Sequence, residues 1–119
     1  MSNTYQIFLI SDSTGETLDR IFLALKAQFK NIEYKINEFP FTRTENQISK
    51  ILEEAKKKDN SIILYTIVDN SLAKFLANRS EDVGLPCFGV LGNLILSFSK
   101  LLNQKASHEP SGQHVLNEE

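Results

Sequence analysis

Residues 11–17, SDSTGET, combine the residue types that could hold a phosphate or a sulfate. They follow an apolar run, YQIFLI, and a helical pattern begins directly after them. Gly15 allows a tight turn and the close approach of a ligand. The first N–H groups of a helix have no partner inside the helix, so together with the hydroxyls of Ser13, Thr14 and Thr17 they could bind an anion.

The same loop also fits ordinary helix capping. Ser13 stands three residues before Glu16, which is the spacing of a capping box. Asp12 opposes an anion, because its carboxylate would repel a phosphate unless it points away, binds a metal or accepts a substrate hydroxyl. An anion site and a plain cap both remain open from this loop alone.

Arg43, in FPFTRT, is the one cation in the loops SDSTGET, FPFTRT, TIVDN and GVLGN. Thr42 and Glu45 have the spacing of a second capping box, so we expect Arg43 at the start of a helix. A guanidinium can bind a phosphate or a carboxylate through two parallel hydrogen bonds. The alternative is an ordinary exposed arginine.

Other side chains favour structural roles. Asp69 and Asn70 follow an apolar run and fit a helix cap. Cys87 lies in an apolar segment and fits a small core residue better than a nucleophile. His108 and His114 lie in a polar segment, and no paired His or Cys spacing indicates a metal site.

Four segments have the patterns of strands. Residues 5–10 and 61–68 are apolar almost throughout, as in strands covered on both faces. Residues 32–39 alternate, which predicts a strand with one wet face near a sheet edge. Residues 84–91, GLPCFGVL, offer a short fourth strand.

Helical spacing separates these strands. It predicts helices over 14–30, over 43–58, from about residue 69, and after the fourth strand. The first helix is expected to face inward through Leu18, Ile21, Phe22, Leu25 and Phe29. The last is expected to face inward through Leu94, Ile95, Phe98, Leu101 and Leu102.

This alternation predicts a three-layer α/β domain with a flavodoxin-like parallel sheet of about four strands, in the order 2-1-3-4. Ligands bind beyond the carboxyl ends of such strands, so we expect the four loops to form the site. Residues 1–103 are assigned to this domain and residues 104–119 to a polar C-terminal tail.

Composition excludes several classes of protein. The chain has 119 residues, one cysteine and a net charge of −2. The charge argues against a nucleic-acid partner, and no apolar run approaches membrane-spanning length. A single cysteine permits no internal disulfide, so a cytoplasmic location is expected.

The segments ISDSTGET, FPFTRTENQI, ILYTIVDN, GLPCFGVLG and HEPSGQH occur in this order. Together they resemble the bacterial regulatory proteins of pyruvate, phosphate dikinase and phosphoenolpyruvate synthase, over essentially the whole chain. The resemblance implies a bifunctional serine/threonine kinase and pyrophosphorylase. Such a protein phosphorylates a threonine of its target enzyme with ADP as donor, and removes that phosphate with inorganic phosphate, releasing pyrophosphate.

The later half of that family carries a G-x-S-R-x-x-K-T segment for ADP, and this sequence ends at VLNEE without one. It also contains neither G-x-x-x-x-G-K-[ST] nor G-x-G-x-x-G. We therefore expect the N-terminal part of a family member, with no cofactor of its own, inactive alone and partnered by a C-terminal P-loop domain. The resemblance places residues 11–17, Arg43, Gly112 and His114 near the phosphate or the target threonine, and assigns no catalytic residue.

Other functions remain open. A flavodoxin-like domain could bind flavin phosphate or another phosphate-bearing ligand, although the chain has no tryptophan and Asp12 occupies the first hydroxyl position of the flavodoxin loop. A phospho-receiver domain fits the size, with Asp12 and Asp69 ending two strands, but the usual paired acids, the later lysine and a fifth strand are missing. A folded fragment without activity of its own is the remaining possibility.

Overall fold

Strands and helices alternate strictly along residues 4–107, the part of the chain that the computed structural model describes. The elements are β1 (Thr4–Ser11), α1 (Glu16–Lys26), β2 (Glu33–Phe39), α2 (Glu45–Lys57), β3 (Ser61–Thr66), α3 (Asn70–Asp82), β4 (Cys87–Gly89) and α4 (Gly92–Leu102).

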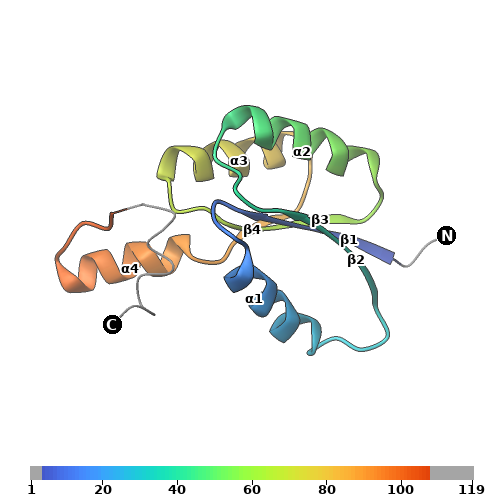
Figure 1. Ribbon diagram of the computed structural model, residues 1–119, viewed down its shortest axis with the longest axis horizontal. Coiled ribbons are helices and arrows are strands. Elements are labelled where there is room, and N and C mark those ends of the chain that lie inside the picture. The colour runs from blue at the N-terminus through green and yellow to red at the C-terminus, as the bar shows by residue number, and fades with distance from the viewer. Residues whose placement is uncertain (1–3, 108–119) are drawn as a thin grey trace.

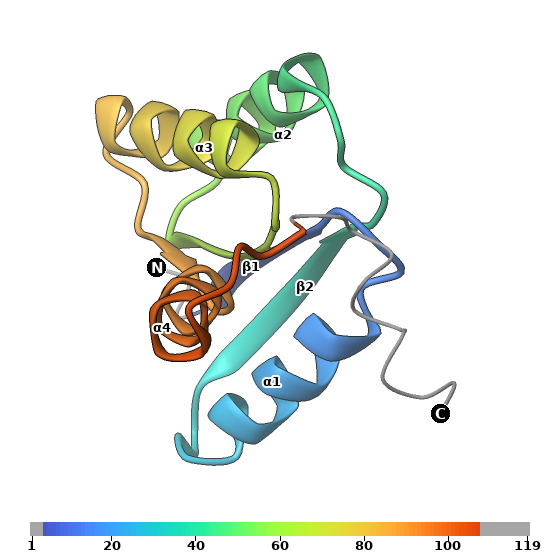
Figure 2. The same ribbon diagram turned by 90° about the vertical axis from the view of Figure 1, so that its left-hand side faces the viewer.

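The strands form one parallel sheet of four strands in the order β2-β1-β3-β4. Helices α2 and α3 cover one face, and α1 and α4 lie on the other side (Figure 1, Figure 2). This is the predicted three-layer flavodoxin-like α/β architecture, with β1 and β3 in the centre. The carboxyl ends of neighbouring parallel strands meet at one edge of the sheet, which brings the loops after β1, β2 and β3 together.

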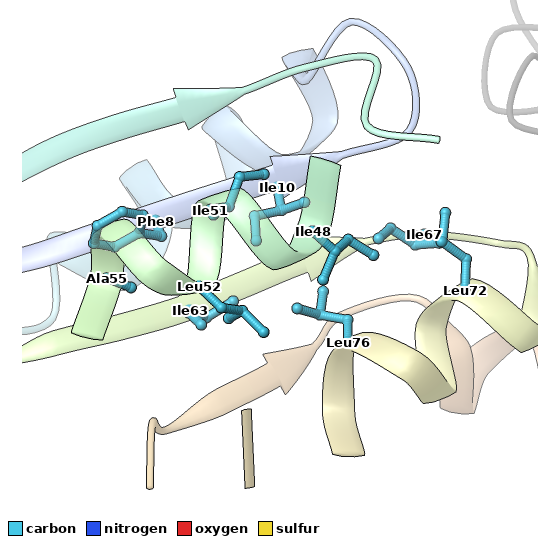
Figure 3. Close-up of a cluster of buried hydrophobic side chains, with 10 residues drawn as sticks. All are labelled: Phe8, Ile10, Ile48, Ile51, Leu52, Ala55, Ile63, Ile67, Leu72 and Leu76. Carbon is cyan, nitrogen blue, oxygen red and sulfur yellow. The ribbon is translucent and has the colours of Figure 1, made fainter. Parts of the chain in front are cut away.

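The main core lies between the sheet and the pair α2 and α3 (Figure 3). Helical spacing in α2 and α3 turns one face of each helix toward the sheet. The buried side chains are Phe8, Ile10, Ile48, Ile51, Leu52, Ala55, Ile63, Ile67, Leu72 and Leu76.

The core beneath α1 is smaller, and its buried members are Ile7, Leu9, Leu18, Phe22 and Leu64. The expected inward face of the first helix was too wide: Leu25 and Phe29 are exposed. Phe29 is exposed because α1 ends at Lys26 and does not reach it, whereas Leu25 lies in the last turn of the helix, where none of the residues is buried. The Tyr34 ring of β2 packs edge-on against the Phe22 ring of α1, with 5.4 Å between the ring centroids.

Both predicted capping boxes were wrong. Helix α2 is capped by Thr44, whose hydroxyl accepts the N–H of Gln47 at 3.1 Å. Thr42 is instead buried and donates its hydroxyl to the Phe39 carbonyl at 2.9 Å. Helix α1 follows Gly15, with φ of 91° and no side-chain cap.

The expected inward stripe of the last helix was also wrong. None of the residues of α4 is buried. After β4 the helix runs away from the sheet instead of folding back over the strands (Figure 1). No helix of residues 4–107 has the length and apolar character needed to cross a membrane.

Candidate functional site

The loop after β1 is tied to the end of β3 through Asp12. The buried Asp12 carboxylate accepts the Val68 N–H at 2.8 Å, and the Asp12 N–H donates to the Thr66 carbonyl at 3.2 Å. Of the possibilities left open for this carboxylate, the geometry favours the first: it points into the junction of the two loops rather than toward solvent.

The loop after β2 is tied to the same loop by backbone hydrogen bonds. The Thr42 N–H donates to the Ser11 carbonyl at 2.8 Å, and the Phe41 N–H donates to the Ser13 carbonyl at 2.9 Å. These two hydrogen bonds hold the backbone of Ser11 and Ser13 against the loop after β2. The structure therefore brings the loops after β1, β2 and β3 into one connected rim.

Ser13 belongs to the interior of this rim. Ser11 and Ser13 are both buried, the Ser13 N–H donates to Ser11 Oγ at 3.1 Å, and the two hydroxyl oxygens are 3.4 Å apart. This packing explains why Ser13 does not cap α1. It also removes the Ser13 hydroxyl from the surface that a ligand would meet.

Thr66 adds a buried hydroxyl that the sequence analysis missed. Its backbone pairs with Ser11, and it shares the α1 side of the sheet with Leu64 two residues earlier. Thr66 Oγ1 is buried and has no hydrogen-bond partner within residues 4–107. Strand register alone could have placed Thr66 beside Ser11, but the register is not visible in an apolar run such as SIILYTIV.

The surface of the loop is made by residues 14–17. Thr14 and Glu16 are exposed, and Gly15 and Thr17 are half-buried. The Glu16 N–H lies 3.4 Å from Thr14 Oγ1, a long and weak hydrogen bond. The start of α1 thus presents backbone N–H groups and two threonine hydroxyls to solvent, the arrangement expected of an anion site.

A hollow beside this loop is too small for a phosphate. Its volume is about 10 Å³, space for about one water molecule, and it is lined in part by Thr14, Gly15, Asp19 and Glu38. A hydrogen bond with Asp19, followed by burial and repulsion from Asp19, raises the pKa of Glu38. An anion would therefore have to approach the exposed side of residues 14–17, away from these acids.

The Arg43 side chain is exposed, but two contacts hold its guanidinium in one orientation. Its Nε donates to the Asp12 carbonyl at 2.9 Å, and its Cζ lies 5.5 Å from the centre of the Phe41 ring. Its two terminal nitrogens have no hydrogen-bond partner among the described residues. The guanidinium is thus attached to the SDSTGET loop with its outer edge available for an acidic ligand.

The remaining candidates have structural roles or lie elsewhere. Asp69 caps α3 by accepting the Leu72 N–H at 2.9 Å, as predicted. Cys87 is half-buried against the main core, and burial raises the pKa of its thiol, which disfavours the nucleophilic thiolate. Gly112, His108 and His114 lie outside the described residues. The described part of the chain holds no group of three or more His, Cys, Asp and Glu side chains that could bind a metal.

Comparison with known proteins identifies the family. The model of the kinase/pyrophosphorylase family matches residues 7–119. A protein of Pelagibacter ubique (strain HTCC1062), provisionally named a pyruvate, phosphate dikinase regulatory protein, is 76% identical over 119 residues, which are 100% of this chain and 43% of that protein. A protein of Chelativorans sp. (strain BNC1) with the same provisional name is 38% identical over 115 residues, 97% of this chain and 42% of its own length.

The chain therefore spans about two fifths of the length of these relatives. The family match extends from within β1 through every later element of the fold. The chain belongs to the kinase/pyrophosphorylase family.

Proposed function

We propose that this chain is the N-terminal domain of a regulatory kinase and pyrophosphorylase that controls pyruvate, phosphate dikinase or phosphoenolpyruvate synthase. The full protein would phosphorylate a threonine of its target with ADP and remove the phosphate with inorganic phosphate. The observation that carries this proposal is the family match over residues 7–119. The provisional names of the relatives support the first target, pyruvate, phosphate dikinase.

In this function the rim would hold the phosphoryl group rather than the nucleotide. Thr14, Gly15 and Thr17 offer hydroxyls and backbone N–H groups, and Arg43 offers a guanidinium tied to the same loop. Phosphoryl transfer depends mainly on positioning and on stabilising charge around the transferred group. Asp12 opposes this charge less than its sequence position indicated, because its buried carboxylate accepts the Val68 N–H.

ADP would be bound by the part of the protein that this chain does not span. The hollow at the SDSTGET loop has room for about one water molecule, and the sequence contains no P-loop segment. This chain alone is therefore expected to bind inorganic phosphate weakly, to bind ADP poorly, and to transfer no phosphate.

Nuclear magnetic resonance tests the phosphate site directly. Inorganic phosphate titrated into the 119-residue chain should shift the amide signals of residues 14–17 and the Arg43 side chain. ADP should give no further shifts beyond those of phosphate. Phosphate without effect on residues 14–17 would contradict the proposed site, and micromolar ADP binding would contradict its assignment to another part of the protein.

A further inference from the structure

Helix α4 has the composition of a buried helix. Its sequence, GNLILSFSKLL, carries one charged side chain, Lys100. Apolar residues make up most of the helix, and a helix of this composition is normally covered by other parts of a protein. Yet none of the residues of α4 is buried.

The outer side of α4 is a continuous apolar stripe. Helical spacing aligns Leu94, Phe98, Leu101 and Leu102, which are 56%, 57%, 80% and 64% exposed. Phe88 on the neighbouring edge strand β4 is 56% exposed as well. We call these five exposed side chains the α4 surface, and exposed apolar side chains in such numbers mark an interaction site.

The inner side of α4 is also incompletely packed. A pocket of about 380 Å³, partly open to solvent, lies between α4, α3 and the end of β3, and Ala73, Ile95 and Leu96 contribute to its lining. The helix therefore lacks close packing on the side facing the domain as well as on the side facing solvent.

We propose that the α4 surface is the docking surface for the part of the family protein that this chain does not span. The matched residues cover 43% and 42% of the two relatives, so more than half of each protein must be attached to a domain of this kind. Among the helices of residues 4–107, α4 is the one with no buried residue. The near absence of charge on α4 selects an apolar partner surface.

This inference rests on family membership and not on the phosphate site. Residues 1–119 would be joined to the portion of the Pelagibacter ubique relative that follows its matched residues, giving a full-length chimera. Leu101→Cys would place a thiol on the α4 surface, and Leu23→Cys would place a matched thiol on α1, where Leu23 is 62% exposed. Half-buried Cys87 serves as the folding reference in both variants.

Labelling of each thiol by a maleimide would be followed by peptide mass spectrometry, in the 119-residue chain and in the chimera. The thiol at position 101 should react at least about tenfold more slowly in the chimera, and the thiol at position 23 at the same rate in both. Equal rates at position 101, or equal slowing at both positions, would overturn the proposal. Slow labelling at position 101 in the 119-residue chain that speeds up on dilution would also overturn it, because a second copy would then be the occupant. No activity is measured, so failure here is separate from failure of the proposed function.

Discussion

The two faces of the sheet are packed to very different degrees. The core between the sheet and the helices α2 and α3 contains ten buried apolar side chains, whereas the core between the sheet and α1 contains five and α4 adds none. Burial of apolar surface is the main favourable term in folding. The stability of the domain is therefore expected to reside chiefly on the α2 and α3 side.

The less packed side carries the start of α1 and the whole of α4. Thr14 and Thr17 lie at the start of α1, and helix α4 lies on the same side of the sheet (Figure 2), whereas Arg43 lies just before α2 on the other side. A surface that receives a ligand or a partner cannot also be covered within the domain. The α2 and α3 side of the sheet mainly stabilises the fold, and the less packed side leaves the start of α1 and helix α4 available to other molecules.

Core truncations give the largest expected difference between the two faces. Leu76→Ala removes a fully buried side chain between α3 and the sheet and should lower the free energy of unfolding by about 2–5 kcal/mol. Leu101→Ala on α4 should change it by no more than about 0.5 kcal/mol. Urea unfolding of both variants measures the two changes in the free energy of unfolding. Similar losses would show that the two sides contribute equally to stability.

Phosphate binding tests the role of Arg43. Arg43→Gln should weaken phosphate binding roughly tenfold, since a hydrogen bond to a charged group contributes about 1.5–3 kcal/mol. Arg43→Lys should recover part of the loss, because it keeps the charge without the paired donors. Affinities would come from the chemical-shift titration.

Arg79 provides a matched control. It is exposed and lies 5.3 Å over Phe75, much as Arg43 lies over Phe41, but it sits in the last turn of α3, away from the start of α1. Arg79→Gln should leave phosphate affinity unchanged. Equal losses in the two glutamine variants would show that only overall charge is being measured.

Thr66→Val tests whether the buried hydroxyl beneath the SDSTGET loop takes part in phosphate binding. A buried hydroxyl without a partner costs about 1–3 kcal/mol, so its replacement by a methyl group should keep or raise the free energy of unfolding. Phosphate affinity should stay unchanged, because the proposed anion lies on the exposed side of residues 14–17. A clear loss of affinity would instead place the anion beneath the loop, against Thr66.

The smallest expected effect concerns Glu38 and pH. Asp19 raises the pKa of Glu38 above its ordinary value near 4.5. The contribution of Glu38 to the free energy of unfolding is therefore fully present below that value, and it is lost as pH rises through the raised pKa. Glu38→Gln should therefore raise the melting temperature slightly at pH 7 and less at pH 4. Glu53→Gln on α2 is the control. An equal rise in melting temperature in both variants would show that the interaction of Glu38 with Asp19 is not the cause.

Much of the fold could be predicted from the sequence because apolar runs and helical spacing alternate so clearly. SIILYTIV is apolar almost throughout, and its first six residues form the central strand β3. The strand order followed from one contrast, between this run and the alternating IEYKINEF, which forms the edge strand β2.

Details that depend on register or packing could not be predicted. Thr42 with Glu45 and Thr44 with Gln47 both have capping-box spacing, and only the tertiary position of Thr42, buried at the rim, decides between them. The apolar residues of α4 predicted an inward face, and hydrophobicity alone does not say whether the covering surface belongs to the same domain. Thr66 gave no signal because its burial beside Ser11 depends on strand register.

Phosphate transfer by the chimera of residues 1–119 and the rest of the Pelagibacter ubique relative is the most direct test of the proposed function. The chimera and the 119-residue chain would each be incubated with ADP and pyruvate, phosphate dikinase that carries no phosphothreonine at the start, and the phosphothreonine formed on the dikinase would be measured by mass spectrometry. The account predicts phosphothreonine with the chimera, a strong reduction with its Arg43→Gln variant, and none with the 119-residue chain. Phosphothreonine formed by the 119-residue chain alone, or none formed by a folded chimera, would contradict the account.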